Sequence, residues 1–144
     1  MKKFLSLVVA ALLSASAVAS VSAAKFTDVD ANNEALNDAV ELLTALNVTK
    51  ATTETTFGTE ENVTRQQMAA FIYRMMKAGK SVEGGVNTTS FTDLDDSTFY
   101  FMVSWANSQG IIKGRSATTF DPKGGITLQD AYTMIVRALG YEKE

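Results

Sequence analysis

The sequence predicts an all-α fold made of two tandem helix-loop-helix repeats that pack as a small helical bundle. The first observation is a repeat: Thr56-Phe57 recurs as Thr119-Phe120, and Val63-Thr64 recurs as Ile126-Thr127, in each case 63 positions later. The second is that apolar residues spaced by three and four positions follow both copies. A fixed period indicates repeated structural units, and this spacing is typical of helices with one buried face.

The second helix of each repeat begins at a predicted capping box. Thr64 pairs with Gln67, and Thr127 with Asp130, so that a hydroxyl and a side chain three positions later satisfy backbone amides of the first turn. We expect the apolar residues behind these caps to face the core: Met68, Phe71, Ile72 and Met75 in the first copy, and Ala131, Met134, Ile135, Ala138 and Leu139 in the second.

The first helix of each repeat is predicted at about 34–46 and about 98–108. Asn32 or Asn33 suits the N-cap of the earlier helix. Asn47 and Gly110 suit the left-handed residue that often follows a helix. The residues expected to face inward are Leu36, Ala39, Val40 and Leu43 in the first, and Phe101, Met102 and Trp105 in the second.

Four segments organise the chain. Residues 1–24 predict a secretory signal peptide, because two lysines precede an apolar run that ends in small residues. Residues 25–76 form the first repeat, residues 77–90 a linker rich in Gly, Ser, Thr and Asn, and residues 91–144 the second repeat. We therefore expect a secreted protein that has no membrane partner once the signal peptide is cleaved.

Composition excludes several classes of function. The chain has 13 Lys and Arg against 16 Asp and Glu, and an acidic chain without a basic stripe argues against a nucleic-acid partner. It has no His and no Cys, which removes most nucleophile–base pairs and nearly all zinc sites. Asp28-Val29-Asp30 has the spacing of a calcium loop, but Asn33 and Ala39 stand where such a loop needs Gly and Glu, and an Asx-turn explains the acids as well. We expect no enzyme, no metal site and no cofactor.

Arg65 is the residue that a purely structural interpretation does not explain. It would occupy the first position of a helix, where exposed amides already give partial positive charge, and a cation there costs roughly 0.3–1 kcal/mol. An anionic ligand would resolve this, because free amides and the guanidinium would bind it together. The alternative is an ion pair with Glu60 or Glu61, or packing along a neighbouring helix. Spacing alone does not separate the two.

The ordered motifs of the chain resemble those of the S-layer homology (SLH) domain. The second copy carries Phe91-Thr92-Asp93-Leu94, Trp105, Gly110-Ile111-Ile112-Lys113-Gly114 and Thr119-Phe120-Asp121-Pro122, and the first carries Phe26-Thr27-Asp28-Val29, Thr56-Phe57 and Val63-Thr64-Arg65. The resemblance covers essentially the whole chain after the signal peptide. It implies a non-catalytic all-α module of the bacterial cell wall or S-layer, which binds a secondary cell-wall polysaccharide that often carries anionic pyruvyl ketals.

The resemblance also implies a ligand site in a groove between repeats. Arg65 would contact the ligand, Thr64 would cap the helix and Asp28 would lie nearby, with Asp93 as its counterpart in the second copy. Trp105 is expected either to pack in the core or to stack on a sugar ring.

The second copy departs from the family pattern, because Leu128 stands at the position of the arginine. We expect this copy either to be structural only or to draw positive charge from Lys113, Arg115 or Lys123. The family commonly presents three repeats, and repeat arrays need about three units to bury their faces. The alternative function is therefore a helical module that self-associates as a homo-oligomer, with Arg65 in an ion pair and no glycan contact.

Overall fold

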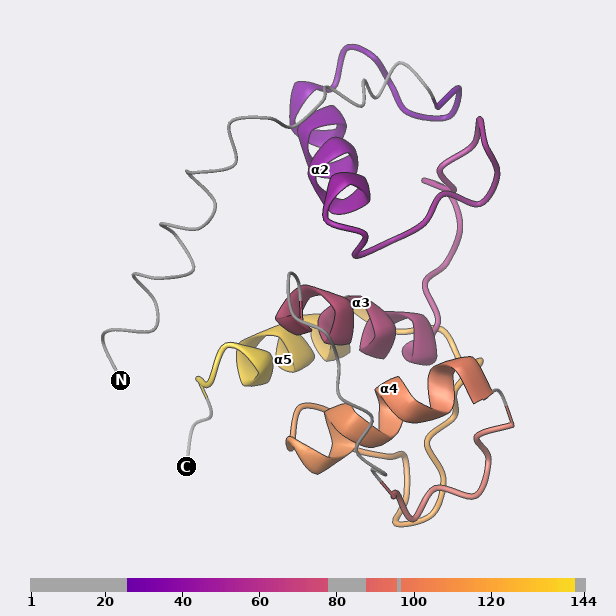
Figure 1. Cartoon of the computed structure of the whole chain (residues 1–144), viewed down its shortest axis with the longest axis vertical. Helices are drawn as coiled ribbons and strands as arrows, with labels where there is room; N and C mark the ends of the chain where they lie inside the picture. The colour runs from indigo at the N-terminus through magenta and orange to yellow at the C-terminus, as the bar shows by residue number, and fades with distance from the viewer. Residues whose placement is uncertain (1–25, 78–87, 96, 142–144) are drawn as a thin grey trace.

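The computed structural model describes residues 26–77, 88–95 and 97–141, and these residues contain four helices and no strand (Figure 1). The helices are α2 (Glu34–Ala45), α3 (Arg65–Lys77), α4 (Ser97–Ser108) and α5 (Leu128–Ala138). The predicted all-α fold is therefore confirmed. The predicted signal peptide and most of the predicted linker lie outside the described residues. None of the described helices has the length and hydropathy needed to cross a membrane.

Helices α2, α3 and α5 begin at predicted capping residues. The side chain of Asn33 caps α2 by accepting a backbone amide of the first turn at 3.1 Å. Thr64 and Gln67 form the predicted capping box: the Gln67 amide donates to the Thr64 hydroxyl at 3.3 Å, and the Thr64 amide donates to the Gln67 side chain at 2.8 Å. Thr127 caps α5 by accepting from the amide of Asp130 at 3.1 Å.

The same turn ends α2 and α4. Asn47 and Gly110 adopt positive φ angles of 54° and 71°, as expected of residues that follow a helix in the left-handed conformation. The next amides, of Val48 and Ile111, each donate at 2.9 Å to a carbonyl near the end of the preceding helix.

Helix α3 packs on the second repeat. Among the described helices it contacts α4 and α5, and no helix packs on α2 (Figure 1). An isolated antiparallel bridge joins Thr64 to Gly125, next to a hydrogen bond of 2.9 Å from the Ile126 amide to the Val63 carbonyl. The packing of α3 therefore crosses the boundary between the two sequence repeats.

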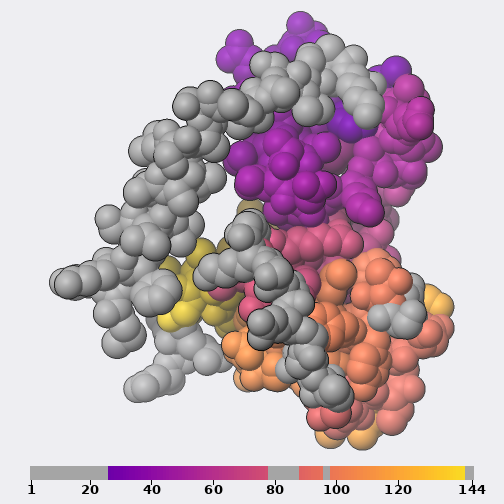
Figure 2. Space-filling view, viewed as in Figure 1, coloured from indigo at the N-terminus to yellow at the C-terminus, as the bar shows by residue number. Residues whose placement is uncertain are grey.

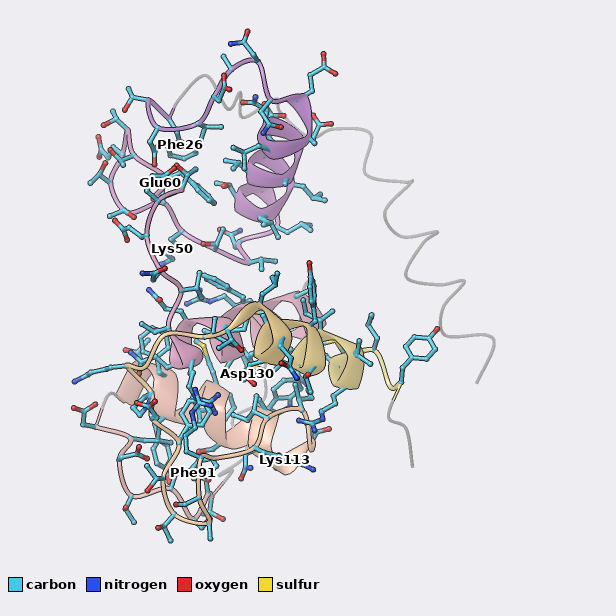
Figure 3. The ribbon with its side chains drawn as sticks, turned by 180° about the vertical axis from the view of Figure 1, so that it is seen from behind. Phe26, Lys50, Glu60, Phe91, Lys113 and Asp130 are labelled. Carbon is cyan, nitrogen blue, oxygen red and sulfur yellow. The ribbon has the colours of Figure 1, made fainter. Side chains whose placement is uncertain are left out.

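The core is divided into two clusters. The large cluster contains Ala69, Ile72, Phe91, Val103, Ala106, Ile111, Ile112, Phe120, Met134 and Ala138. The small cluster contains Phe26, Val29 and Val40, with Leu36, Ala51 and Phe57 packed against them. We call residues 26–63 the N-terminal unit, and residues 64–77, 88–95 and 97–141 the C-terminal unit. Figure 2 shows them as two lobes, and Figure 3 shows Phe26 and Phe91 in different lobes.

The predicted inward faces are wrong at several positions. Ala39 is exposed, and Met75 and Leu139 are 39% and 56% exposed. In α4 the fully buried residues are Val103, Ser104 and Ala106. The predicted face of Phe101, Met102 and Trp105 is only partly buried. Helical periodicity identifies an apolar face, but the elements that pack against a helix decide which part of that face is buried.

Candidate functional site

Asp28 holds the loop that leads to α3. Its carboxylate accepts backbone hydrogen bonds from Phe57 at 2.8 Å, Gly58 at 2.7 Å and Thr59 at 3.1 Å. The Phe57 amide, together with the other two amides, lowers the pKa of Asp28 to about 2 against the opposing effect of burial. The carboxylate is thus engaged within the N-terminal unit.

Asp93 holds the corresponding loop of the C-terminal unit, which leads to α5. Its carboxylate accepts from the amides of Phe120 at 2.9 Å and Asp121 at 2.7 Å. Burial raises the pKa of Asp93, but these amides and the charge of Arg65 outweigh it, so that the pKa lies below its ordinary value. Gly58 and Asp121 occupy equivalent positions in the two loops, and both have positive φ, at 97° and 64°.

Arg65 is a buried connector between α3 and the C-terminal loop. Its side chain is 4% exposed. The Nε group donates to the carbonyl of Phe120 and the Nη2 group to the carbonyl of Lys113, both at 2.9 Å. The guanidinium also lies 4.7 Å from the centroid of the Phe120 ring. Buried donors need such partners. A core role for Arg65 was not part of either sequence interpretation.

Asp130 lies at the start of α5 (Figure 3). Two guanidinium groups approach its carboxylate. Nη1 of Arg65 is 3.8 Å from the Asp130 oxygen, and Nη1 of Arg115 is 3.5 Å from the same oxygen. Burial lowers the pKa of Arg65, and the charge of Arg115 lowers it further, whereas Asp130 opposes both. The Arg115 side chain is 48% exposed, so the site has one buried and one accessible cation.

The first amides of α3 are already occupied. The Arg65 amide donates to the carbonyl of Gly124 at 2.9 Å, and the Gln66 amide donates to the carbonyl of Pro122 at 3.0 Å. The amide of the third helical residue donates to the Thr64 hydroxyl. The expectation that free amides at this helix start would bind an anion is therefore wrong, because a loop of the second repeat takes that place.

Trp105 and Lys113 have different surroundings. The Trp105 ring is partly buried against the large cluster and stands edge-on to Tyr73, with 5.1 Å between the ring centroids. The ammonium of Lys77 lies 5.6 Å from the same ring. Packing at the core is thus observed for Trp105, and sugar stacking stays a prediction. The carbonyl of Lys113 accepts a hydrogen bond from Arg65, and the side chain of Lys113 is exposed.

Four of the predicted site residues surround one loop of the C-terminal unit. Arg65 and Asp93 contact residues 120 and 121, Thr64 bridges to Gly125, and Lys113 accepts from Arg65. The other two lie elsewhere. Asp28 belongs to the N-terminal unit, and Trp105 packs beside Tyr73, about two helical turns along α3 from Arg65.

Sequence reasoning missed the electrostatic role of Asp130. It was expected only as a capping residue, whereas Arg115 was expected as a source of charge. The available signal was that Asp130 introduces an acid at the position that Gln67 has in the first copy, in the repeat that lacks the arginine. The signal was weak, because periodicity does not show that the two helix starts lie side by side.

Within the described ranges, no group of three or more acids is arranged to hold a metal ion. The Asp30 side chain accepts from the amide of Asn32 at 2.9 Å, which is the Asx-turn that the sequence offered as the explanation of this acidic stretch.

Comparison with known proteins agrees with the motifs. The family model of the S-layer homology domain matches residues 25–69 and 90–131. A surface layer protein of Brevibacillus choshinensis is 30% identical over 99% of this chain and 13% of its own length. A middle cell wall protein of Brevibacillus brevis is 28% identical over 96% of this chain and 13% of its own length. A cell surface protein of Thermoanaerobacter kivui is 30% identical over 92% of this chain and 18% of its own length.

The chain therefore spans 13 to 18% of the length of these curated relatives. No solved structure matches the chain significantly. The family and the relatives support a secreted protein of the cell surface. Because the two matched segments cover more than half of the sequence and contain the motifs of both repeats, the chain belongs to the S-layer homology domain family.

Proposed function

We propose that this chain is a non-enzymatic module that anchors a protein to the bacterial cell surface by binding an anionic secondary cell-wall polysaccharide non-covalently. Family membership supports the anchoring role. The finer part of the proposal is that a carboxylate substituent of the glycan, such as a pyruvyl ketal, binds at Arg115.

The observation that carries this proposal is the incomplete pairing of Arg115 with the residues that the structure describes. Its guanidinium lies 3.5 Å from Asp130 and 3.9 Å from Asp121. A charge-assisted hydrogen bond between such groups is about 2.7–2.9 Å long. The two acids therefore hold Arg115 in place without saturating its donors. Because the planar guanidinium binds carboxylates in a bidentate manner, the exposed face of Arg115 suits an acidic sugar substituent.

The surroundings of Arg115 suit the rest of a sugar. A shallow surface hollow is lined by Asp93, Asp95, Arg115, Thr119, Asp121, Pro122 and Lys123. Lys123 adds a second exposed cation, paired with Asp95 at 3.0 Å. Carboxylates and a threonine hydroxyl accept hydrogen bonds from sugar hydroxyls. In this proposal Arg65 contacts no ligand directly and instead positions Asp130 and the loop around Phe120.

Co-sedimentation with cell-wall sacculi tests the proposal. The secreted protein should pellet with intact sacculi, and it should stay in solution after the non-peptidoglycan polysaccharide has been extracted. Arg115→Gln should weaken the binding roughly tenfold, which corresponds to one lost charge-assisted contact. Mild acid treatment, which removes ketal-linked pyruvate, should have the same effect on the wild-type protein.

Lys50→Gln is the matched control, because Lys50 is also exposed and lies in the N-terminal unit. It removes the same charge away from the hollow, so it should leave the binding unchanged. Equal loss in both variants would indicate a general charge effect and would contradict a site at Arg115. A folded wild-type protein that ignores intact sacculi would contradict the anchoring function.

A further inference from the structure

Helix α5 carries an apolar stripe that no other described element covers. Leu128, Tyr132 and Val136 follow one another at spacings of four residues, and their exposed fractions are 68%, 59% and 44%. They line an open groove together with Lys113, Gln129, Thr133, Arg137 and Tyr141. A contiguous exposed apolar patch with a polar rim is typical of an interaction site.

The first repeat contains the same stripe in a covered state. Arg65, Ala69 and Tyr73 stand at the equivalent positions of α3, and all three are buried. They are covered in the C-terminal unit, where the Tyr73 ring stands edge-on to Phe101 and Trp105 of α4. The α3–α4 contact is therefore an example, within this protein, of a helix that covers this stripe.

Helix α2 exposes the surface that corresponds to the covering face of α4. Asp38 and Leu42 are the counterparts of Phe101 and Trp105. Leu42 is 52% exposed, and Leu46, one turn further, is 39% exposed. Within the described ranges, α5 therefore lacks a helix that covers its stripe, and α2 lacks a helix for its exposed face to cover.

The loop after α2 is adapted to receive leucine in place of arginine. In the C-terminal unit, Arg65 donates to the carbonyls of Lys113 and Phe120. The equivalent carbonyls of Lys50 and Phe57 accept instead from the hydroxyls of Thr49 at 3.3 Å and Thr52 at 3.2 Å.

Both of these carbonyls in the N-terminal loop already accept a hydrogen bond from a threonine hydroxyl, so neither needs a guanidinium donor. The apolar Leu128, which replaces the arginine in α5, therefore fits against it without leaving a buried acceptor unpaired.

Charge favours the same pairing. Helix α2 carries Glu34, Asp38 and Glu41 and no basic residue. Among the described residues, the groove on α5 is bordered by Lys113 and Arg137 and by no acid. Opposite charges around an apolar contact favour this partner over a second α5.

We propose that α5 of one copy docks on α2 and the following loop of a second copy, so that the α3–α4 packing is repeated between chains. The interface is heterologous, because two different surfaces meet. This inference goes beyond glycan binding and does not depend on it. It assigns a surface to the self-association that the sequence left open.

Sedimentation velocity of the secreted protein, without any glycan, tests the proposal. The wild-type protein should associate as its concentration rises. Leu128→Glu and Leu42→Glu should each weaken the association at least tenfold, because each places a charge in one half of the apolar contact. Tyr100→Glu is the control, since Tyr100 is a 37% exposed aromatic residue on α4 outside both surfaces, and it should associate like the wild type.

Mixing the two defective variants gives the decisive result. The Leu128→Glu protein retains an intact α2 surface, and the Leu42→Glu protein retains an intact α5 surface. A heterologous interface predicts that an equal mixture forms one-to-one dimers that neither variant forms alone. A mixture that stays monomeric while the wild type associates would overturn the proposal. A Leu42→Glu protein that associates like the wild type would overturn it in favour of a symmetric contact through α5. A wild-type protein that stays monomeric would overturn it and leave the groove to another occupant.

Discussion

Asp28 and Asp93 show how a single carboxylate fixes a loop that has little apolar surface of its own. Each accepts adjacent amides of a turn that contains a positive φ residue, and in both units the residue before the aspartate donates its own amide across the loop at 2.9 Å. The sequence predicted these two residues as neighbours of a ligand. The structure shows that they shape the backbone, and a ligand contact for them stays a prediction.

The depressed pKa of Asp28 makes a prediction for the acid stability of the N-terminal unit. The pKa falls from 3.8 to about 2 on folding. The charged carboxylate therefore contributes stability that is fully present above about pH 4 and is lost as the pH falls towards 2. Asp28→Asn should lower the stability of this unit at neutral pH and flatten its loss between pH 4 and 2. Hydrogen exchange of the amides of residues 57–59 measures both effects.

Glu60→Gln serves as the control, because it removes an exposed acid from the same loop. It should leave the exchange of these three amides and their dependence on pH as in the wild type. Equal behaviour of the two variants would mean that net charge, and not the hydrogen bonds to Asp28, governs the loop.

At the scale of elements, local signals and long-range contacts differ in how well the sequence reveals them. The caps at Asn33, Thr64 and Thr127 and the helix ends at Asn47 and Gly110 were all predicted, because each depends on residues within a few positions. The burial of Arg65 was not predicted. It depends on α3 packing against the other repeat, and no local pattern shows which neighbour a helix chooses.

Replacing Arg65 tests whether it connects α3 to the C-terminal unit. Arg65→Leu would remove the donors to two carbonyls and leave them unpaired in a buried place, so it should destabilise this unit by roughly 2–4 kcal/mol. The loop of the N-terminal unit suggests the compensation, since Thr52 stands at the position of Arg115 and supplies a hydroxyl there. Arg115→Thr in the Arg65→Leu background should recover roughly 1 kcal/mol.

Urea unfolding followed by Trp105 fluorescence measures these changes, because Trp105 is the single tryptophan and packs in the C-terminal unit. Unchanged stability in Arg65→Leu would contradict a structural role and would leave Arg65 free to serve as a ligand contact. No gain from the second substitution would mean that the two loops are not equivalent at this position.

At the scale of the whole molecule, the two units are unequal. The small cluster has three buried residues, the large cluster has ten, and no helix of the described chain packs on α2. The N-terminal unit spans residues 26–63, which is close to the lower limit of about 40 residues for an independently stable domain. Its stability therefore depends on contacts at its edges, such as the 3.3 Å hydrogen bond from Arg74 to the carbonyl of Val48.

We therefore expect the N-terminal unit to unfold before the C-terminal unit. The helical signal of α2 should be lost at lower urea concentration than the fluorescence change of Trp105, so that the two probes give different midpoints. Non-coincident transitions of this kind are the standard sign of unfolding in more than one step.

A matched pair of substitutions assigns the two transitions. Val40 and Val103 occupy equivalent positions of α2 and α4, and both are almost completely buried. Each Val→Ala change should cost roughly 2 kcal/mol. Val40→Ala should shift only the early transition, and Val103→Ala only the fluorescence transition. If both variants shifted both probes equally, the chain would unfold as one unit. If the early midpoint also rose with protein concentration, docking of a second copy on α2 would be stabilising the weaker unit by mass action.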